Sequence, residues 1–511
     1  MNASASQPVI APKRRLEFAL MTAALIGFAL LMFGKMLFPE YCLCTTDDNI
    51  GMIKVNKAGL PGAFLGGWSD SVYLGMPGGI APVMWNALLI WLAPVRLYIN
   101  WAHAFDLTLA SCFLVLFLRA WKVGWAAIGL GVLTAFWLGS NLTLTYAGHL
   151  GKYGVLLFAG IALFCLARAL SQKTSLPWSI IAGGAIGLMF LEQLDVALFF
   201  GFVIGAYAVF LAFRQWLAHG TWLKSAVALG LMGGAGLLLA ASTMLSGYAS
   251  NVKGAVIMQK ESPREKWDYV TQWSVPPDET IDLIAPHYFG IRSGEPEGPY
   301  RGRTGQSAGW EQTHQGFMNF RLESIYIGAI PVALALFAVA AALLCRRSQS
   351  GHWRKSRQMD RKMRKGSGFG VQDGFFLNPD TLNPGFSDQN SEVGSQKSGV
   401  PPSTLHPPPS TMLSPDRRAE ILFWGAAALV TLLLAYGRYF PLYALFYQLP
   451  MVNAIRNPNK FIQIFQICLG ILAAYGLDAA LKNGSRRSEI GDQRSEVGNR
   501  RSEVGGRRSE V

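Results

Sequence analysis

Two adjacent carboxylates, Asp47 and Asp48, follow the first long apolar segment of the chain by a few residues. A carboxylate is costly to remove from water, so acidic side chains next to a membrane helix are uncommon unless water, a cation or a substrate hydroxyl accompanies them. Adjacent acids in a loop are also often simply solvated. Their position after an apolar helix nevertheless makes Asp47 and Asp48 the first candidates for a functional site.

A second candidate lies between two later apolar segments, where His149 and Lys152 are three residues apart at the end of a helix. Both side chains can reach one face, so they could hold a phosphate group together. Gly148 and Gly151 would let backbone N–H groups approach the same phosphate, and the next helix would add its positive N-terminus. The alternative is structural: Lys152 extends to the lipid headgroups and His149 caps a helix.

Glu192 and Asp195 occupy a short turn between two apolar helices. Their spacing places both carboxylates on one side of a helix end. They either line the same cavity as Asp47 or mark the membrane boundary, and the boundary interpretation is favoured for one of them.

Aromatic residues, among them Trp273, are interleaved with charged residues between positions 247 and 323. Aromatic rings beside charged groups are typical of sugar-binding sites, because the rings stack on sugar CH faces while the ions bind hydroxyls. Aromatic side chains at this height also form the ordinary interfacial belt of membrane proteins.

Composition indicates the framework that must position these residues. Of the 511 residues, 51% are hydrophobic and 15% are charged, which excludes a water-soluble protein. We therefore expect an all-α fold, a polytopic transmembrane helix bundle of about ten spans. The stretch 81–95 is apolar but short and is expected to be an interfacial or re-entrant helix. The expected spans are 16–38, 100–118, 123–143, 153–169, 177–191, 195–214, 224–246, 324–345, 419–438 and 460–481.

The positive charges set the expected topology, because Lys and Arg collect in cytosolic loops. With both termini cytosolic, every inward turn is basic. The formal charge of +14 is then explained by topology and by attraction to anionic membrane lipids, with no nucleic acid as a partner. The expected parts are a cytosolic N-terminus (1–15), a transmembrane core (16–346) with outward loops 39–99 and 247–323, a disordered cytosolic linker (347–418), two further transmembrane helices (419–481) with outward loop 439–459, and a low-complexity repeat tail (482–511).

Several motifs, in order along the chain, resemble the YfhO family of bacterial membrane proteins, which belongs with the membrane glycosyltransferases of the GT-C type. The resemblance covers most of residues 16–346 and 419–481. The matching stretches are 146–152 (YAGHLGK), 273–279 (WSVPPDE), 286–290 (PHYFG), 323–328 (ESIYIG), 441–447 (PLYALFY) and 456–461 (RNPNKF).

The resemblance implies a GT-C-like core and a reaction, the transfer of a sugar from a polyprenyl-phosphate donor to a glycan or lipid acceptor of the cell envelope. It places the protein in the bacterial cytoplasmic (inner) membrane with its site on the outer face. Asp47 or Asp48 would be the general base that deprotonates the acceptor hydroxyl. His149 and Lys152 would hold the lipid phosphate, with Arg456 and Lys460 as a second cationic pair. No set of metal ligands is predicted, and participation of a divalent metal ion is left open.

The chain is shorter than usual members of that family, so a truncated, non-catalytic membrane subunit is one alternative. Another is a transporter or flippase for lipid-linked sugars, for which polar residues deep inside several spans are expected. Asp106 is the main residue of that kind.

Overall fold

The fold is known from a computed structural model, which describes residues 12–45, 47–69, 76–78, 84–170, 174–247, 262–290, 300–319, 321, 324–344, 414–449 and 451–506. Of the expected cytosolic N-terminus, residues 1–11 lie outside this set. So do residues 345–413, which include nearly all of the expected linker.

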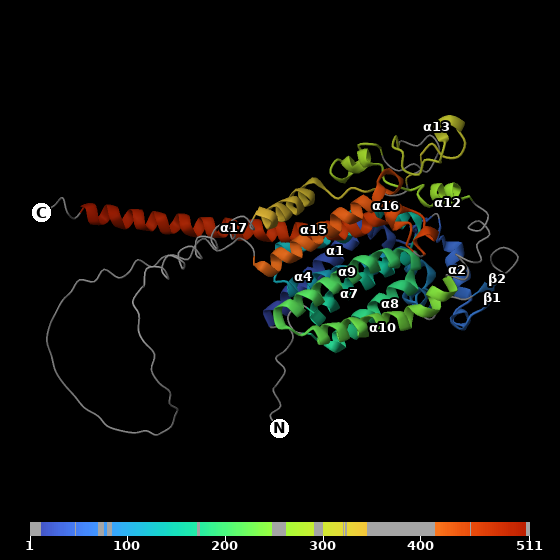
Figure 1. Cartoon of the computed structure of the whole chain (residues 1–511), viewed down its shortest axis with the longest axis horizontal. Helices are drawn as coiled ribbons and strands as arrows, with labels where there is room; N and C mark the ends of the chain where they lie inside the picture. The colour runs from blue at the N-terminus through green and yellow to red at the C-terminus, as the bar shows by residue number, and fades with distance from the viewer. Residues whose placement is uncertain are drawn as a thin grey trace, which may run out of the picture. The chain divides into compact units, whose positions relative to one another are not determined.

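The described chain is a bundle of helices, with one short antiparallel pair of strands, β1 (Gly67–Ser69) and β2 (Met76–Gly78) (Figure 1). Seven helical segments are long and apolar enough to cross a membrane: Arg15–Leu37, Val95–Ala120, Gly151–Leu170, Leu194–His219, Trp222–Leu245, Pro415–Ala435 and Pro458–Asn483. Three shorter apolar helices, Trp125–Phe136, Leu176–Glu192 and Ala329–Leu344, correspond to the other three expected spans.

The labelled helices that form the bundle are α1 (Pro12–Phe33), α4 (Val95–Ala120), α5 (Trp125–Phe136), α7 (Gly151–Leu170), α8 (Leu176–Glu192), α9 (Leu194–His219), α10 (Trp222–Gly247), α15 (Pro415–Ala435) and α17 (Phe461–Gly506). Short elements at the end of the bundle where α4 and α7 begin are α2 (Ile50–Ala58), α3 (Trp85–Leu92), α6 (Ser140–Ala147), α12 (Pro263–Val270), η4 (Pro277–Leu283), α13 (Trp310–Thr313) and α16 (Pro441–Phe446). We call this end the cavity end.

The surface of the bundle is apolar where a soluble protein would be polar. Leu31 on α1 and Leu238 on α10 are about four-fifths exposed, at 80% and 81%. Many other large apolar side chains of the bundle are also exposed, and an extended apolar surface of this kind marks contact with lipid or another apolar partner. The seven long helices and this surface together indicate a multi-pass membrane protein.

Small residues bring the central helices close together. A Cβ on Gly131 of α5 would lie 2.7 Å from the carbonyl oxygen of Gly470 on α17, and one on Gly160 of α7 would lie 3.0 Å from that of Ala110 on α4. In lipid, helix association depends on such close packing rather than on the hydrophobic effect. The central helices therefore form a tight frame for the loops at the cavity end.

The expected span 123–143 is not one helix. It divides into α5, which ends at Phe136, and α6, which begins at Ser140. Gly139 between them has φ +58°, a conformation that residues with a Cβ rarely adopt, and a Cβ there would lie 2.5 Å from the carbonyl oxygen of Tyr326. The prediction was wrong at this point because the break depends on a segment almost 190 positions away.

The structure also describes three other parts that were predicted from the sequence: the short apolar stretch, the repeat tail and the end of the linker. The stretch 81–95 contains the short helix α3, whose C-terminal carbonyls at Ile90, Trp91 and Ala93 accept hydrogen bonds from the Lys57 ammonium at 2.7–2.8 Å. The repeat at 482–511 continues α17 as far as Gly506. α15 begins at Pro415, inside the stretch 347–418 that the sequence assigned to the linker.

Candidate functional site

A cavity of about 360 Å³ lies at the cavity end of the bundle. It is within the usual range of small-molecule sites, roughly 300–1,000 Å³. Its walls come from the loop before α2, from α2 and α3, from the start of α4, from the α6–α7 turn and from the α8–α9 turn. The lining residues are Asp48, Ile53, Asn56, Leu60, Met84, Asn86, Ala87, Ile90, Tyr98, His149, Leu150, Gly151, Glu192 and Gln193.

Asp48 is fixed in the cavity wall by the α6–α7 turn. The backbone N–H of Leu150 donates to its carboxylate at 3.3 Å, and the hydroxyl of Thr45 donates to its carbonyl oxygen at 2.7 Å. Gly148, with φ +84°, makes this approach possible, because a Cβ there would lie 2.8 Å from the Asp48 nitrogen. Burial raises the pKa of Asp48, opposed by the Leu150 hydrogen bond and reinforced by the Asp47 charge.

Asp47 is placed differently from its neighbour. Its side chain is 61% exposed, and its carboxylate lies 3.5 Å from Nε2 of His149. It does not line the cavity. Of the two adjacent acids, Asp48 is therefore the one that a ligand in the cavity would meet.

Glu192 is the second carboxylate of the cavity and is buried at the end of α8. Its carboxylate packs on α7 at Gly154, where a Cβ would lie 2.6 Å from Oε2. The side-chain amide of Asn86 donates to Oε2 at 2.5 Å, and the Asn86 amide oxygen accepts a hydrogen bond from the Tyr98 hydroxyl at 3.1 Å. Asn86 on α3 therefore holds Glu192 directly, and Tyr98 on α4 holds Asn86. On α7, the missing side chain at Gly154 leaves room for the Glu192 carboxylate.

His149 connects the cavity with a group of cationic side chains. Burial, together with the positive charges of Lys152, Lys460 and Arg456, lowers its pKa to about 4, with Asp195 opposing them. At neutral pH the imidazole is therefore uncharged. It can donate or accept a hydrogen bond, but a phosphate would be neutralised by the lysines and the arginine rather than by His149.

The cationic side chains lie beside the cavity and do not line it. Lys152 on α7 and Lys460 just before α17 are buried, and Lys460 forms an ion pair with Asp195 on α9. Arg456 is exposed, and its guanidinium lies 5.6 Å from the ring centre of Tyr269 and 5.7 Å from that of Trp273. Such cation–π contacts hold the guanidinium in place while leaving it charged.

The predicted site residues thus form two adjoining groups. Asp48, His149 and Glu192 line the cavity, whereas Lys152, Lys460, Asp195, Arg456 and Trp273 form the cationic group. Lys152 is buried, so the alternative in which it extends to the lipid headgroups does not describe it. Glu192 accepts a hydrogen bond from Asn86, and Asp195 forms an ion pair with Lys460.

Two cavity residues, Asn86 and Tyr98, were not predicted. Their signal was present in the sequence, because a polar side chain in an otherwise apolar helix is unusual. Asp106, about two turns further along α4 from Tyr98, is also buried and accepts a hydrogen bond from Trp85 Nε1 at 2.8 Å. Within the described ranges, no three His, Cys, Asp or Glu side chains converge as a metal-binding group.

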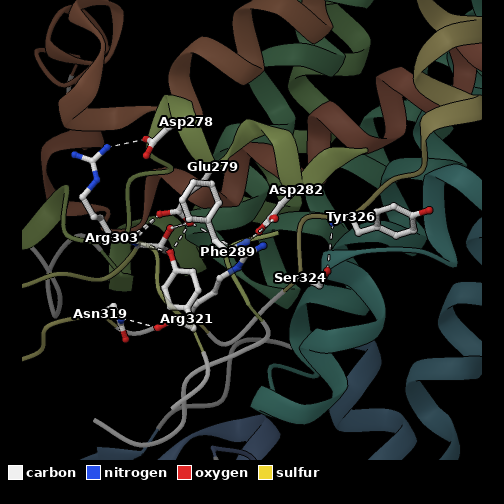
Figure 2. A network of polar contacts seen from close by, with 11 residues as sticks. Asp278, Glu279, Asp282, Phe289, Arg303, Asn319, Arg321, Ser324 and Tyr326 are labelled. Atoms are coloured by element: carbon white, nitrogen blue, oxygen red, sulfur yellow. Dashed lines mark hydrogen bonds and ion pairs between the residues drawn. The ribbon is translucent and has the colours of Figure 1, made fainter. Parts of the chain in front are cut away.

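A second polar cluster, not predicted from the sequence, lies in the segment 277–321 (Figure 2). Glu279 is buried, and its Oε1 accepts hydrogen bonds from the backbone N–H groups of Arg303 at 2.7 Å and Thr304 at 3.2 Å. Its Oε2 accepts from the Tyr300 hydroxyl and from Thr304 Oγ1. Buried Arg321 pairs with Asp282 and lies 3.7 Å from Glu279. We call Glu279, Asp282, Tyr300, Thr304 and Arg321 the carboxylate–arginine cluster.

Hydrogen bonds of residues that flank the carboxylate–arginine cluster join this part of the chain to α6 and to the end of α15. Ser324 N donates to Thr143 Oγ1 on α6 at 3.0 Å, and Val275 N donates to the Ala435 carbonyl at 2.9 Å. Asn459 N donates to the Trp273 carbonyl at 3.1 Å, which places Trp273 next to Lys460. The chain that leads into the cluster therefore also lies against the segment that carries Lys460.

Comparison of the chain with protein-family models, with curated proteins and with solved structures gave no match in any of the three.

Proposed function

We propose that this protein is a membrane glycosyltransferase that transfers a sugar from a polyprenyl-phosphate donor to a hydroxyl of a cell-envelope glycan or lipid. The observation that carries the proposal is the juxtaposition, at one end of an apolar helix bundle, of a carboxylate-lined cavity with a group of cations. The motifs shared with the YfhO family favour the same reaction, with the cavity end facing the outside of the bacterial cytoplasmic membrane.

In this reaction Asp48 accepts the proton of the acceptor hydroxyl as the hydroxyl oxygen bonds to the anomeric carbon of the donor sugar. The bond between that carbon and the phosphate oxygen breaks, and polyprenyl phosphate leaves with the bonding electrons. Lys152, Lys460 and Arg456 neutralise the negative charge that develops on the phosphate, and the N-terminus of α7 adds a partial positive charge. His149, uncharged in the free protein, donates a hydrogen bond to the phosphate. Phosphate is a good leaving group, so no acid is needed to protonate it.

Asp48 is assigned as the base because it lines the cavity and because burial raises its pKa. A raised pKa makes the carboxylate a stronger proton acceptor. Asp47 contributes by its charge, at a distance.

The test is turnover of polyprenyl-phosphate sugar donors by the full-length protein in membranes, measured as release of polyprenyl phosphate. Wild type is expected to be active, Asp48→Asn to lose about a hundredfold or more, and Asp47→Asn to lose only a fewfold. The two variants make the same chemical change at neighbouring positions. Equal turnover by wild type and Asp48→Asn would exclude Asp48 as the base.

A second candidate is a transporter or flippase for lipid-linked sugars, favoured by two buried groups on α4. Among the described residues, His103 has no hydrogen-bond partner at either ring nitrogen, and Asp106 has none at Oδ2. Unpaired polar groups at membrane depth often belong to a transport path. Under this alternative, Asp106→Asn would abolish movement of a labelled lipid-linked sugar across vesicles, whereas the transferase predicts near-normal donor turnover in that variant.

A further inference from the structure

The cavity and the cationic group differ sharply in charge although they adjoin each other. Among the lining residues are two carboxylates, Asp48 and Glu192, and neither Lys nor Arg. A further ionisable lining residue, His149, is uncharged at neutral pH because its pKa is about 4. Burial raises the pKa of Glu192 to about 7, so above that pH the cavity disfavours anions, while the neighbouring cations Lys152, Lys460 and Arg456 attract them.

The hydrogen-bonding groups of the cavity select for donors. A carboxylate only accepts hydrogen bonds, so Asp48 and Glu192 require a ligand that carries O–H or N–H groups. Asn86 directs its side-chain amide to Glu192 and its oxygen to Tyr98, which fixes the orientation of both. The opposing apolar side chains Ile53, Leu60 and Ile90 provide a surface for CH groups.

We propose that this cavity binds an uncharged glycosyl group and rejects an anionic one, and that Glu192 is the residue that determines this selectivity. Its position, seated on Gly154 and held by Asn86, fixes the carboxylate where it accepts hydrogen bonds from sugar hydroxyls. A carboxylate or phosphate on the sugar would be placed beside Glu192 and Asp48, and such like-charge contacts are costly. The proposal deepens the proposed function, since the cavity would hold a sugar at the reacting site.

The test uses two probes that differ in one group, octyl β-glucoside and octyl β-glucuronide. Binding of each to the purified full-length protein in lipid nanodiscs is measured by calorimetry at about pH 9, above the pKa of Glu192, and below the micelle concentration of the probes. Wild type is expected to bind the glucoside at least about tenfold more tightly than the glucuronide. Equal affinity for the two probes would overturn the proposal without any variant.

Glu192→Gln removes the charge and keeps the shape, so it is expected to reduce the discrimination by about tenfold, mainly through tighter binding of the glucuronide. Glu311→Gln makes the same change on α13, outside the cavity, and is expected to leave both affinities unchanged. Full discrimination in Glu192→Gln would overturn the role of Glu192. If this variant does not fold, Asp48→Asn provides the same comparison for the other carboxylate of the cavity.

A glycosyl group in the cavity could belong to the donor or to the acceptor. Adding a short-chain polyprenyl-phosphate glucose to the glucoside complex separates the two, because a donor sugar displaces the glucoside and an acceptor site leaves it bound. Either result supports a glycosyl site and assigns its source. The assay involves no turnover, so discrimination without donor turnover would overturn the transferase alone, and turnover without discrimination would overturn this inference alone.

Discussion

The cavity and the carboxylate–arginine cluster both place carboxylates out of water at the same end of the bundle, yet they satisfy them in different ways. In the cluster, Glu279 accepts four hydrogen bonds and lies beside the Arg321 guanidinium. In the cavity, the carboxylate of Asp48 accepts from Leu150 N at 3.3 Å and faces open space. A carboxylate whose hydrogen-bonding capacity is filled by the protein stabilises the fold. A carboxylate that has fewer donors among the described residues is available to a ligand.

The largest effect is expected on stability, from substitution of Arg321 in the carboxylate–arginine cluster. Arg321→Met leaves Glu279 and Asp282 buried without their cation, so the free energy of unfolding should fall by about 3–5 kcal/mol. Thermal unfolding of the purified protein, followed by loss of monomer, measures this. Arg303→Met is the matched control, because Arg303 and Asp278 are 46% and 50% exposed and their pair should contribute under about 1 kcal/mol. A similar loss in both variants would refute the distinction.

The next largest effect is expected on binding, at Arg456. Arg456→Met removes an exposed cation and leaves no buried carboxylate behind, so stability should be nearly unchanged. The affinity for a polyprenyl phosphate should fall about tenfold or more, since a hydrogen bond to a charged group contributes roughly 1.5–3 kcal/mol. Equilibrium binding of unsubstituted polyprenyl phosphate measures the change. Arg264→Met, an exposed arginine on α12, should bind as wild type does.

Substitution of Gly154 on α7 tests whether the absence of a side chain there positions Glu192. In Gly154→Ala the new Cβ would lie 2.6 Å from Oε2 of Glu192, so the carboxylate must move and unfolding should become easier by about 1–3 kcal/mol. Gly184→Ala on α8 is the control, because nothing lies within 4 Å of its Cβ. That substitution should be neutral or stabilising by up to about 1 kcal/mol. Thermal unfolding distinguishes them, and equal behaviour would count against the packing described for Glu192.

The smallest effect is a shift in pH dependence. Turnover requires ionised Asp48, so the rate should be full above its raised pKa and fall as the pH decreases through that pKa. Asp47→Asn removes a like charge, which lowers the pKa of Asp48 and moves the acid limb to lower pH by less than about one unit. Rate profiles of kcat/KM between pH 4 and 8, roughly the range over which carboxylates and histidines titrate, show the shift. Asp278→Asn, distant from the cavity, should leave the limb in place, and a shift to higher pH in Asp47→Asn would contradict the assignment.

Much of the fold could be predicted because long apolar helices are encoded locally. The segments expected at 16–38 and 195–214 correspond closely to Arg15–Leu37 and Leu194–His219. The break at Gly139 could not be predicted in this way, because it depends on the carbonyl of Tyr326. Hydropathy identifies the segments that are apolar enough to leave water. It does not indicate which distant segment will pack against them.

The candidate site was predictable in part for the same reason. His149 and Lys152 belong to one short motif, and Glu192 and Asp195 to another, so their charge and spacing are visible in the sequence. The pairing of Lys460 with Asp195 spans 265 positions and could not be foreseen. Nor could the uncharged state of His149, since it arises from burial and from cations on other elements.

The break between α5 and α6 has a consequence for the order of biosynthesis. The turn at Gly139 is closed by Ser324 bonding to Thr143, 181 positions apart, and by Gln466 on α17 donating to the carbonyl of Leu138, 328 positions apart. The chain is made from its N-terminus. Therefore α6, and the turn at Gly148 that lies against Asp48, lack these contacts until Ser324 and then Gln466 have been made. The turn that leads into the His149 and Leu150 wall of the cavity is therefore fixed only when α17 packs into the bundle, and Lys460 of the cationic group arrives with the same segment.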